Sequence, residues 1–462
     1  MERLKGPADL ISPTWRPSIR GRICYCRIMQ QSQTTSSQAL QNQGIDSGYA
    51  WFRLAVSLIL MIIGGSGMYM AVIVLPELQQ EFGVARAQAS MPYTFTMVGF
   101  GIGGVFMGRL ADRYGVWLPI VVGGSCLGTG FVLGAGAASL WYFSLVQGLF
   151  VGMLGSSASF APLMADTSLW FLKRRGIAVG IVASGNYMAG AIWPPLVRHW
   201  VDAYGWRDTM MGIGFFCIIT MLPMALLLRR RAPSPNAYQE TTPGENSQKG
   251  SPQESLYSPE KSLGISAHAL LALLCVAGVA CCIAMAMPQV HIVAYCTDLG
   301  FGAVKGAQML SVMLASGVVS RLVFGVISDR IGGLRTLLLG SVLQGIALLL
   351  FIPFQDLASL FVVSALFGLF QGGIVPAYAI IVREYFAPQL AATRVGIVIM
   401  FTLAGMAIGG WMSGWIFDVS GSYEAAFING IGWNLVNLLI VLGLLYRQDR
   451  MKPRMITVGR VA

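Results

Sequence analysis

Long apolar stretches dominate the chain, and their length decides what it can fold into. A helix needs about 20 apolar residues to cross the roughly 30 Å hydrocarbon core of a bilayer. About twelve stretches of this kind follow one another: 51–75, 91–111, 117–137, 141–165, 176–197, 209–228, 266–293, 305–327, 335–353, 358–382, 395–417 and 425–446. The sequence therefore predicts an all-α membrane protein with twelve transmembrane helices.

Composition favours the same class and excludes others. Hydrophobic residues make up 55% of the chain and charged residues 11%, whereas soluble domains carry about 25% charged residues. The net charge of +11 does not indicate nucleic-acid binding, because the basic residues fall in short loops between apolar stretches. The sequence shows no nucleophile–base pair, metal-ligand pattern or phosphate-binding loop. We therefore expect no enzyme, no metal and no cofactor.

One polar segment divides the apolar stretches into two sets. Residues 229–264 are rich in Pro, Ser, Gly and Glu and have no apolar period, so they are predicted to be a disordered linker. The linker joins two predicted six-helix bundles, 49–228 and 265–446. A polar tail, 1–48, precedes the first bundle, and a basic tail, 447–462, follows the second.

The polar N-terminal tail contains no apolar segment typical of a cleavable signal peptide. The residues after Met29 have the composition of an ordinary hydrophilic tail. One hypothesis is therefore that Met29 is the start of the native protein.

The basic residues predict the orientation, because Lys and Arg gather in cytoplasmic loops of membrane proteins. One side of the predicted bundle holds Arg109, Arg113, Lys173, Arg174, Arg175, Arg229, Arg230, Arg231, Arg330, Arg335, Arg383, Arg394, Arg447 and Arg450. The opposite side holds Arg86, Arg198, Arg207 and Lys305. Both termini and the linker are therefore predicted to be cytoplasmic.

Several strings recur about one half-chain later, nearly in register. The pairs are GRLADRYG (108–115) with GVISDRIG (325–332), VQGLFVG (146–152) with FQGGIVP (370–376), and RRGIAVG (174–180) with TRVGIVI (393–399). Asp166 near the end of the fourth stretch likewise has a counterpart in Glu384 near the end of the tenth. Several matches in register indicate a two-fold internal repeat of a six-helix unit.

Over about residues 50–446 the chain resembles the major facilitator superfamily, which carries a Gly-x-Leu-Ala-Asp-Arg-x-Gly motif after helix 2 and an echo of it after helix 8. The matching residues are Gly108, Leu110, Ala111, Asp112, Arg113 and Gly115, then Gly325, Asp329, Arg330 and Gly332. This resemblance implies a transporter whose two halves rock about a central cavity, acting as a monomer in the cell membrane. A bacterial inner membrane is expected on the resemblance alone.

The glycines of the two strings have separate expected roles. Gly115 and Gly332 allow positive φ, so that two helices can reverse direction within a few residues. Gly108 and Gly325 are expected to let helix backbones touch.

The charged residues of the strings are expected to act as a gate. Asp112 and Asp329 would face the positive N-terminus of a helix from the other half. The resemblance implies that these contacts, and the ion pairs that accompany them, form when the cytoplasmic side is shut and break when it opens. The expected ion pairs are Arg113 with Asp166 and Arg330 with Glu384. The alternative is topogenic charge in a tight turn.

Small residues and prolines inside the stretches predict helix packing. The spacings Gly148-x-x-x-Gly152 and Gly405-x-x-x-Gly409 predict close helix contact. Pro194 and Pro195 predict that the fifth span breaks or ends there.

Three longer strings narrow the resemblance. WFLKRRGIAVGIVASGNYMAGAIWPPLV (170–197), PQVHIVAYCTDLGF (288–301) and SGVVSRLVFGVISDR (316–330) are similar to the monocarboxylate and oxalate–formate porter branch. A drug-exporter signature is incomplete, because Ser144 stands where an arginine would precede Gln147. The resemblance implies transport of a small organic anion, a monocarboxylate, coupled to protons or to anion exchange. Transport of a neutral or cationic compound is the alternative.

Arg321 lies within the eighth predicted span. An arginine at the bilayer centre costs about 2.5–3.5 kcal/mol on insertion scales, so it needs a partner or a purpose. Its planar guanidinium suits a carboxylate, and in the resembled branch an arginine at this place contacts the substrate carboxylate. Gly317 replaces the aspartate found one turn earlier in animal members, which leaves one strong anion anchor and favours a monovalent substrate. Snorkelling of Arg321 to the interface is the alternative.

Four further residues are candidates for substrate binding. His291 has an ordinary pKa near neutral, so it is a candidate for binding substrate or carrying a proton. The resemblance implies that helices 1, 4, 7 and 10 line the cavity, which makes Tyr69, Tyr295 and Tyr378 candidate hydroxyl groups. A hydrogen-bonded histidine at the rim and packing or interfacial tyrosines are the alternatives. Beyond substrate, a coupled proton and the surrounding lipid, we expect no partner.

Overall fold

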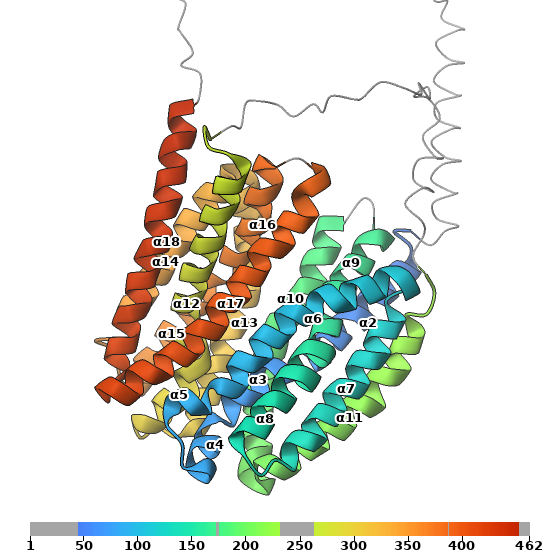
Figure 1. The fold of residues 1–462 in the computed structure, drawn as a ribbon, viewed down its shortest axis with the longest axis vertical. Helices are drawn as coiled ribbons and strands as arrows, with labels where there is room; N and C mark the ends of the chain where they lie inside the picture. Colours follow the sequence, from blue (N-terminus) through green and yellow to red (C-terminus); the bar gives the residue numbers. More distant parts are fainter. Residues whose placement is uncertain (1–44, 172–174, 232–262, 387, 452–462) are drawn as a thin grey trace, which may run out of the picture.

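The computed structural model describes residues 45–171, 175–231, 263–386 and 388–451 (Figure 1). Within these residues it contains twelve helical spans that are long and apolar enough to cross a membrane, and no strand. The predicted all-α fold with twelve spans is therefore confirmed. Met29 and most of the predicted tails and linker lie outside the described residues.

The first six spans come from residues before the linker. They are α2 (Gly48–Gly64) with α3 (Ser66–Ile73), α5 (Arg86–Ala89) with α6 (Met91–Tyr114), α7 (Trp117–Ala135), then α8 (Leu140–Val146) with the π-helical η1 (Gln147–Gly155), the 3-10 turn η2 (Ser156–Ser159) and α9 (Ala161–Trp170), α10 (Arg175–Tyr204) and α11 (Trp206–Leu227). A short helix, α4 (Leu75–Phe82), connects the first two spans.

The last six spans follow the linker. They are α12 (Ala267–Asp298), α13 (Ala303–Ile331), α14 (Gly333–Leu350), α15 (Leu357–Gln371) with α16 (Ile374–Tyr385), α17 (Pro388–Ser420) and α18 (Tyr423–Met451). Figure 1 shows α2–α11 as one bundle, coloured blue to green, and α12–α18 as a second, coloured yellow to red. We call these the N-half and the C-half.

The two halves meet mainly along two pairs of spans. Helix α10 packs against α13, and α5 and α6 pack against α17. The side on which α11 ends and α12 begins, at the top of Figure 1, is called the linker side, and the opposite side the far side. On the linker side the ends of the N-half and C-half helices diverge in Figure 1.

Glycines let span 2 and span 4 approach each other. A Cβ atom added at Gly152 would collide with the backbone of Thr96, and one added at Gly103 would collide with the carbonyl oxygen of Met153. In the C-half, a Cβ at Gly405 would lie 2.6 Å from the carbonyl oxygen of Val279. These contacts confirm the close packing predicted from small-residue spacing.

The predicted break at Pro194 and Pro195 is wrong. Both prolines lie inside α10, which continues to Tyr204. Each proline removes a single backbone donor. In lipid an unravelled segment would leave many more backbone groups without partners, so continuing the helix is favoured.

Candidate functional site

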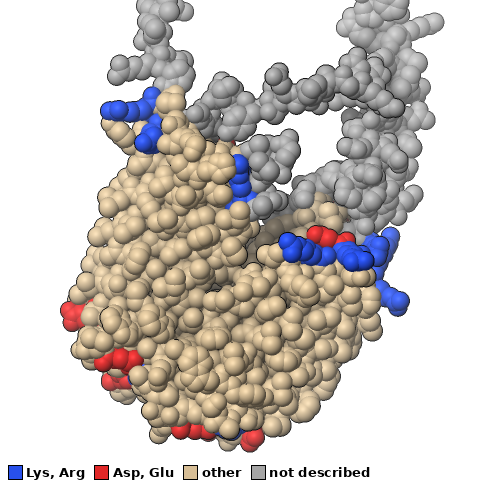
Figure 2. Space-filling model, viewed as in Figure 1, with Lys and Arg blue, Asp and Glu red and all other residues tan. Residues whose placement is uncertain are grey.

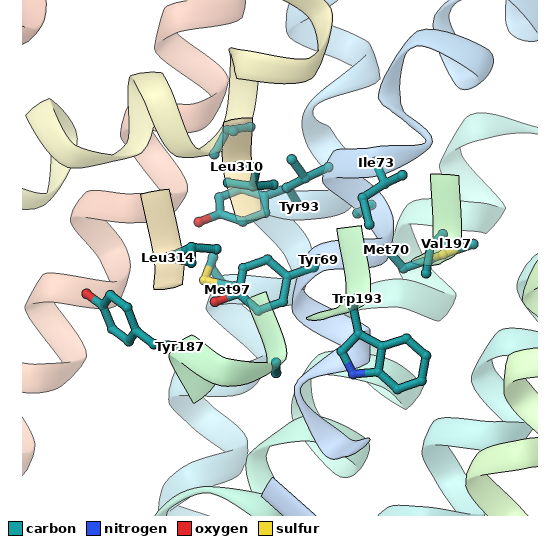
Figure 3. Packing of buried hydrophobic residues seen from close by; sticks show 14 of the residues in the cluster. Tyr69, Met70, Ile73, Tyr93, Met97, Tyr187, Trp193, Val197, Leu310 and Leu314 are labelled. Atoms are coloured by element: carbon teal, nitrogen blue, oxygen red, sulfur yellow. The ribbon is translucent and has the colours of Figure 1, made fainter. Parts of the chain in front are cut away.

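A cavity of about 150 Å³ lies between the halves and takes its walls from both. Its lining is mostly apolar and rich in aromatic and methionine side chains, and Figure 3 shows Tyr69, Tyr93, Met97 and Leu314 gathered in this region. Its polar lining consists mainly of tyrosine, amide, hydroxyl and thiol side chains. Among the described residues around the cavity, Arg321 alone is charged.

Arg321 projects from α13 of the C-half toward α10 of the N-half. Its Nη1 donates a hydrogen bond to the carbonyl oxygen of Ala183 at 2.6 Å. Its guanidinium carbon lies 4.0 Å from the ring centroid of Tyr187. Its Nε is buried and has no hydrogen-bond partner in the structure. A buried donor without a partner costs free energy until an acceptor arrives, so the site has unused capacity for an anion.

Tyr69 lies beside Arg321 in the cavity lining, as predicted for a cavity hydroxyl. Its hydroxyl donates to the carbonyl oxygen of Asn186 at 3.2 Å. The polar lining residues Asn186, Gln289 and Thr402 were not predicted. Polar residues of these types occur throughout the spans, and the sequence does not tell which of them face inward.

His291 lies outside this cavity, toward the far side. Its Nδ1 is 3.1 Å from the hydroxyl of Tyr423, and its Nε2 is 2.7 Å from the carbonyl oxygen of Gly410. Arg86 Nη1 donates to the same Tyr423 oxygen at 2.8 Å. The Tyr423 proton is therefore directed to Nδ1, and Nε2 carries the hydrogen donated to Gly410.

Tyr295 and Tyr378 also lie away from the cavity lining. Tyr295 packs edge-on against Tyr423 and Phe427, with ring centroids 5.4 and 5.7 Å apart, near the far side. The hydroxyl of Tyr378 donates to Asn437 Oδ1 at 3.1 Å inside the C-half. Of the five predicted binding residues, the structure thus brings together Arg321 and Tyr69.

The far side is closed by polar contacts between the halves. Arg86 forms an ion pair with Asp298, the one such pair joining the halves among the described residues. Its guanidinium also lies 4.3 Å from the ring centroid of Phe417. Asp418 accepts hydrogen bonds from the backbone N–H groups of Arg86 and Ala87, at 2.8 and 2.7 Å. The set of Arg86, Asp298, Asp418 and Tyr423 is called the far-side clamp.

On the linker side, the carboxylates have other partners than those expected. Asp166 pairs with Arg53 at 2.7 Å, whereas the guanidinium of Arg113 lies 5.3 Å from the ring centroid of Tyr114. Glu384 accepts a hydrogen bond from the backbone N–H of Gly333 at 3.1 Å, at the start of α14. Arg330 is exposed, and the side chain of Asp329 is outside the described part; Asp112 lies in the wall of a second pocket, with Asp166.

The glycines of the two repeated strings divide into two groups. Gly115 and Gly332 have φ of +87° and +81°, the positive values that the sequence predicts. Gly108 and Gly325 have no neighbouring atom within 4 Å of an added Cβ. The expected backbone contact at these two positions is therefore not made in this conformation.

Arg53 is a buried residue that the sequence reasoning missed. It is 2% exposed and donates to the carbonyl oxygens of Leu228 and Arg230 at 3.2 and 2.9 Å. Its guanidinium also lies 4.6 Å from the ring centroid of Trp170. It therefore ties together the linker-side ends of spans 1, 4 and 6. An arginine just inside the first apolar stretch was the available signal.

No group of three or more His, Cys, Asp or Glu residues in the described ranges could hold a metal ion.

The comparisons with known proteins point to transport. The family model described as Major Facilitator Superfamily matches residues 57–357 and 309–458. The chain is 25% identical over 431 residues to monocarboxylate transporter 12 of Mus musculus, covering 88% of this chain and 87% of that protein. It is 27% identical over 343 residues to monocarboxylate transporter 13 of Rattus norvegicus, covering 74% and 75%.

Solved structures share the fold at low identity. A bacterial homolog of the human lysosomal transporter Spinster, inward-facing and unoccupied, aligns with a TM-score of 0.64 and 14% identity, covering 88% of this chain and 98% of that one. The peptide transporter POT in complex with sulfate aligns with a TM-score of 0.66 and 13% identity, covering 87% and 94%. The relatives are transporters and not enzymes. The chain is a multi-pass membrane transporter and belongs to the major facilitator superfamily.

Proposed function

We propose that this transporter moves a monocarboxylate across the membrane and that Arg321 binds the carboxylate. The observation that carries the proposal is the buried, unpartnered Nε of Arg321 beside a cavity with no other charged lining residue in the described part. A guanidinium in an apolar cavity attracts a single carboxylate strongly, because the low dielectric screens the charges little. The similarity to proteins named monocarboxylate transporters supports the same substrate class.

Transport is proposed to follow alternating access. The far-side clamp holds the far side shut, and the surface is hollowed between the halves toward the linker side (Figure 2). With the linker and both termini in the cytoplasm, as the basic loops predict, this arrangement is the inward-open state. Protons or an exchanged anion would supply the energy.

The repeated Asp-Arg strings are proposed to shut the linker side in the opposite state. Asp112 and Asp329 would then meet helix N-termini of the other half. Arg53 adds a condition to that step, because it already holds Asp166 in the inward-open state. Arg113 must therefore share or displace Arg53 to reach Asp166. His291, Tyr295 and Tyr378 stay candidates for substrate or proton contact in the opposite state, which for Tyr378 requires breaking its hydrogen bond to Asn437.

Uptake of labelled carboxylates into proteoliposomes tests the proposal. Arg321→Gln should abolish uptake, while Arg321→Lys keeps the charge and loses the planar fork, so part of the activity should remain. Arg335→Gln, at an exposed arginine, is the matched control and should transport normally. For Arg321→Lys, loss of one charge-assisted hydrogen bond of about 1.5–3 kcal/mol predicts a roughly tenfold or larger rise in KM.

Two results would contradict the carboxylate assignment. Undiminished carboxylate uptake by Arg321→Gln would remove Arg321 from the binding site. The drug-exporter alternative would be favoured if the wild-type protein took up no carboxylate but transported a neutral or cationic compound, and if Arg321→Gln transported that compound equally well. Imposing a pH gradient in the same vesicles tells proton coupling from anion exchange.

A further inference from the structure

We propose that Tyr187 is a positioning residue for Arg321 and that the site thus formed selects monocarboxylates with an aromatic or bulky apolar body. The inference rests on the proposed carboxylate transport and deepens it. It concerns which carboxylates are bound and which residue of the opposite half holds Arg321 in position to bind them.

The guanidinium of Arg321 is held from the N-half by two contacts on one helix. Tyr187 and Ala183 lie one turn apart on α10, the ring 4.0 Å below the guanidinium carbon and the carbonyl oxygen 2.6 Å from Nη1. A cation over an aromatic face is attracted by the ring quadrupole, so the ring restrains the long side chain without neutralising it. The remaining buried donor, Nε, is left for a ligand.

Gly317 makes room for this ring. A Cβ atom added at Gly317 would collide with Cδ1 and Cε1 of Tyr187. Gly317 precedes Arg321 by one turn on α13, so the ring fills the volume that a side chain there would take. The glycine and the tyrosine are therefore sterically matched across the interface between the halves.

The rest of the cavity suits an apolar group larger than methyl. Its walls include the rings of Tyr93, Phe100 and Phe160 and the side chains of Met97, Met285 and Met406. Rings stack against aromatic walls, and methionine side chains adapt to irregular shapes. An apolar cavity of about 150 Å³ is large enough to hold benzene. An anion with a phenyl group would bury that group here, whereas acetate or lactate would leave the walls facing water.

Substrate choice is tested with full-length protein in proteoliposomes. We expect phenylacetate to have a KM at least tenfold lower than acetate or lactate, with phenylacetate competing against both. Equal or tighter binding of acetate and lactate would overturn the inferred substrate class. If the wild-type protein takes up no carboxylate at all, the proposed function fails instead, so the two failures are distinguishable.

The positioning role is tested by variants at both members of the matched pair. Tyr187→Phe keeps the ring and should keep the wild-type KM for phenylacetate. Tyr187→Leu and Gly317→Ala should each raise KM about tenfold with little change in kcat. Gly180→Ala, on α10 with no atom within 4 Å of the added Cβ, is the control and should behave as wild type.

A double-mutant cycle separates positioning from a general loss of fold. In the Tyr187→Leu background the smaller side chain leaves space at position 317, so Gly317→Ala should add little further effect. A wild-type KM for Tyr187→Leu, or the same effect of Gly317→Ala in both backgrounds, would overturn the positioning role. A Tyr187→Phe variant as impaired as Tyr187→Leu would do the same.

Discussion

Asp418 caps the helix that begins at Arg86: its Oδ1 accepts the Arg86 backbone N–H at 2.8 Å, and its Oδ2 accepts the next backbone N–H at 2.7 Å. The carboxylate comes from the end of α17 in the C-half and the N–H groups from the start of span 2 in the N-half. A carboxylate at a helix N-terminus satisfies free backbone donors and meets the positive end of the helix dipole.

At its other end, span 2 is expected to make a contact of the opposite kind when the linker side is shut. The sequence predicts that Asp112, at the linker-side end of α6, faces a helix N-terminus of the C-half. Asp418 makes that kind of contact at the far-side end of α17, with the roles of the halves exchanged. Span 2 would then take part in one latch at each end, and breaking one while making the other suits a rocking motion.

Removing the far-side cap is predicted to favour the state with the far side open. Asp418→Ala loses hydrogen bonds to a charged acceptor worth about 1.5–3 kcal/mol. That loss shifts the equilibrium between the two states by roughly tenfold or more. Spin labels at exposed Tyr204 and Val304, on the far-side ends of the N-half and C-half, should report longer distances in this variant.

Asp356→Ala is the matched control for that experiment. Asp356 also caps a helix, accepting the backbone N–H of Ser359 at 3.0 Å, but both residues belong to the C-half. Its loss should lower stability without moving the label distances. Identical distance distributions for Asp418→Ala and wild type would show that this cap does not hold the far side shut.

Arg53 is predicted to be essential for stability of the N-half. Removing one partner of a buried ion pair leaves the other charge uncompensated, which costs about 3–5 kcal/mol. Arg53→Met should therefore lower the melting temperature in detergent far more than Arg109→Met, since Arg109 is exposed on the same side. Equal melting temperatures for the two variants would mean that Asp166 finds another partner.

The spans were predictable because bilayer thickness fixes how long an apolar helix must be. The turns at Gly115 and Gly332 were predictable because a glycine ending each repeated string can take positive φ. Which helix faces point into the cavity was not predictable. Lipid and protein interior are both apolar, so a face that lines the cavity and a face that contacts lipid have similar sequences. Tyr69 and Tyr378 look equivalent in sequence, yet only Tyr69 lines the cavity.

Partners distant in sequence were the other limit. Asp166 pairs with a residue 113 positions away, and His291 bonds to a carbonyl 119 positions away. Arg113 was the plausible partner of Asp166 because both lie at the same end of adjacent helices in the repeat. Which arginine reaches the carboxylate depends on the conformational state and on helix rotation, and sequence spacing records neither.

The close contact between spans 2 and 4 is predicted to require that residue 103 has no side chain. Gly103→Ala would force a methyl group against the carbonyl oxygen of Met153, so overpacking should cost about 1–3 kcal/mol and lower the melting temperature. The adjacent Gly104→Ala is the control, because its added Cβ meets no atom within 4 Å. There the better helix propensity of alanine should raise the melting temperature slightly. An equal fall in melting temperature in both variants would show that the effect comes from replacing a glycine in this helix and not from the contact with Met153.

Glu81 is predicted to make a pH-dependent contribution to the stability of the folded protein at the far side. Partial burial raises the pKa of this carboxyl, but hydrogen bonds from Arg207 and Trp206, each 2.6 Å long, outweigh it and lower the pKa below its usual range. A depressed pKa in the folded state stabilises the protein above the unfolded pKa of about 4.3, and that stability is lost as pH falls through the folded pKa. The melting temperature of Glu81→Gln should therefore lie below that of wild type at pH 7, and the two should converge toward pH 3. A gap between the two melting temperatures that stays constant over this range would mean that the carboxylate charge contributes nothing.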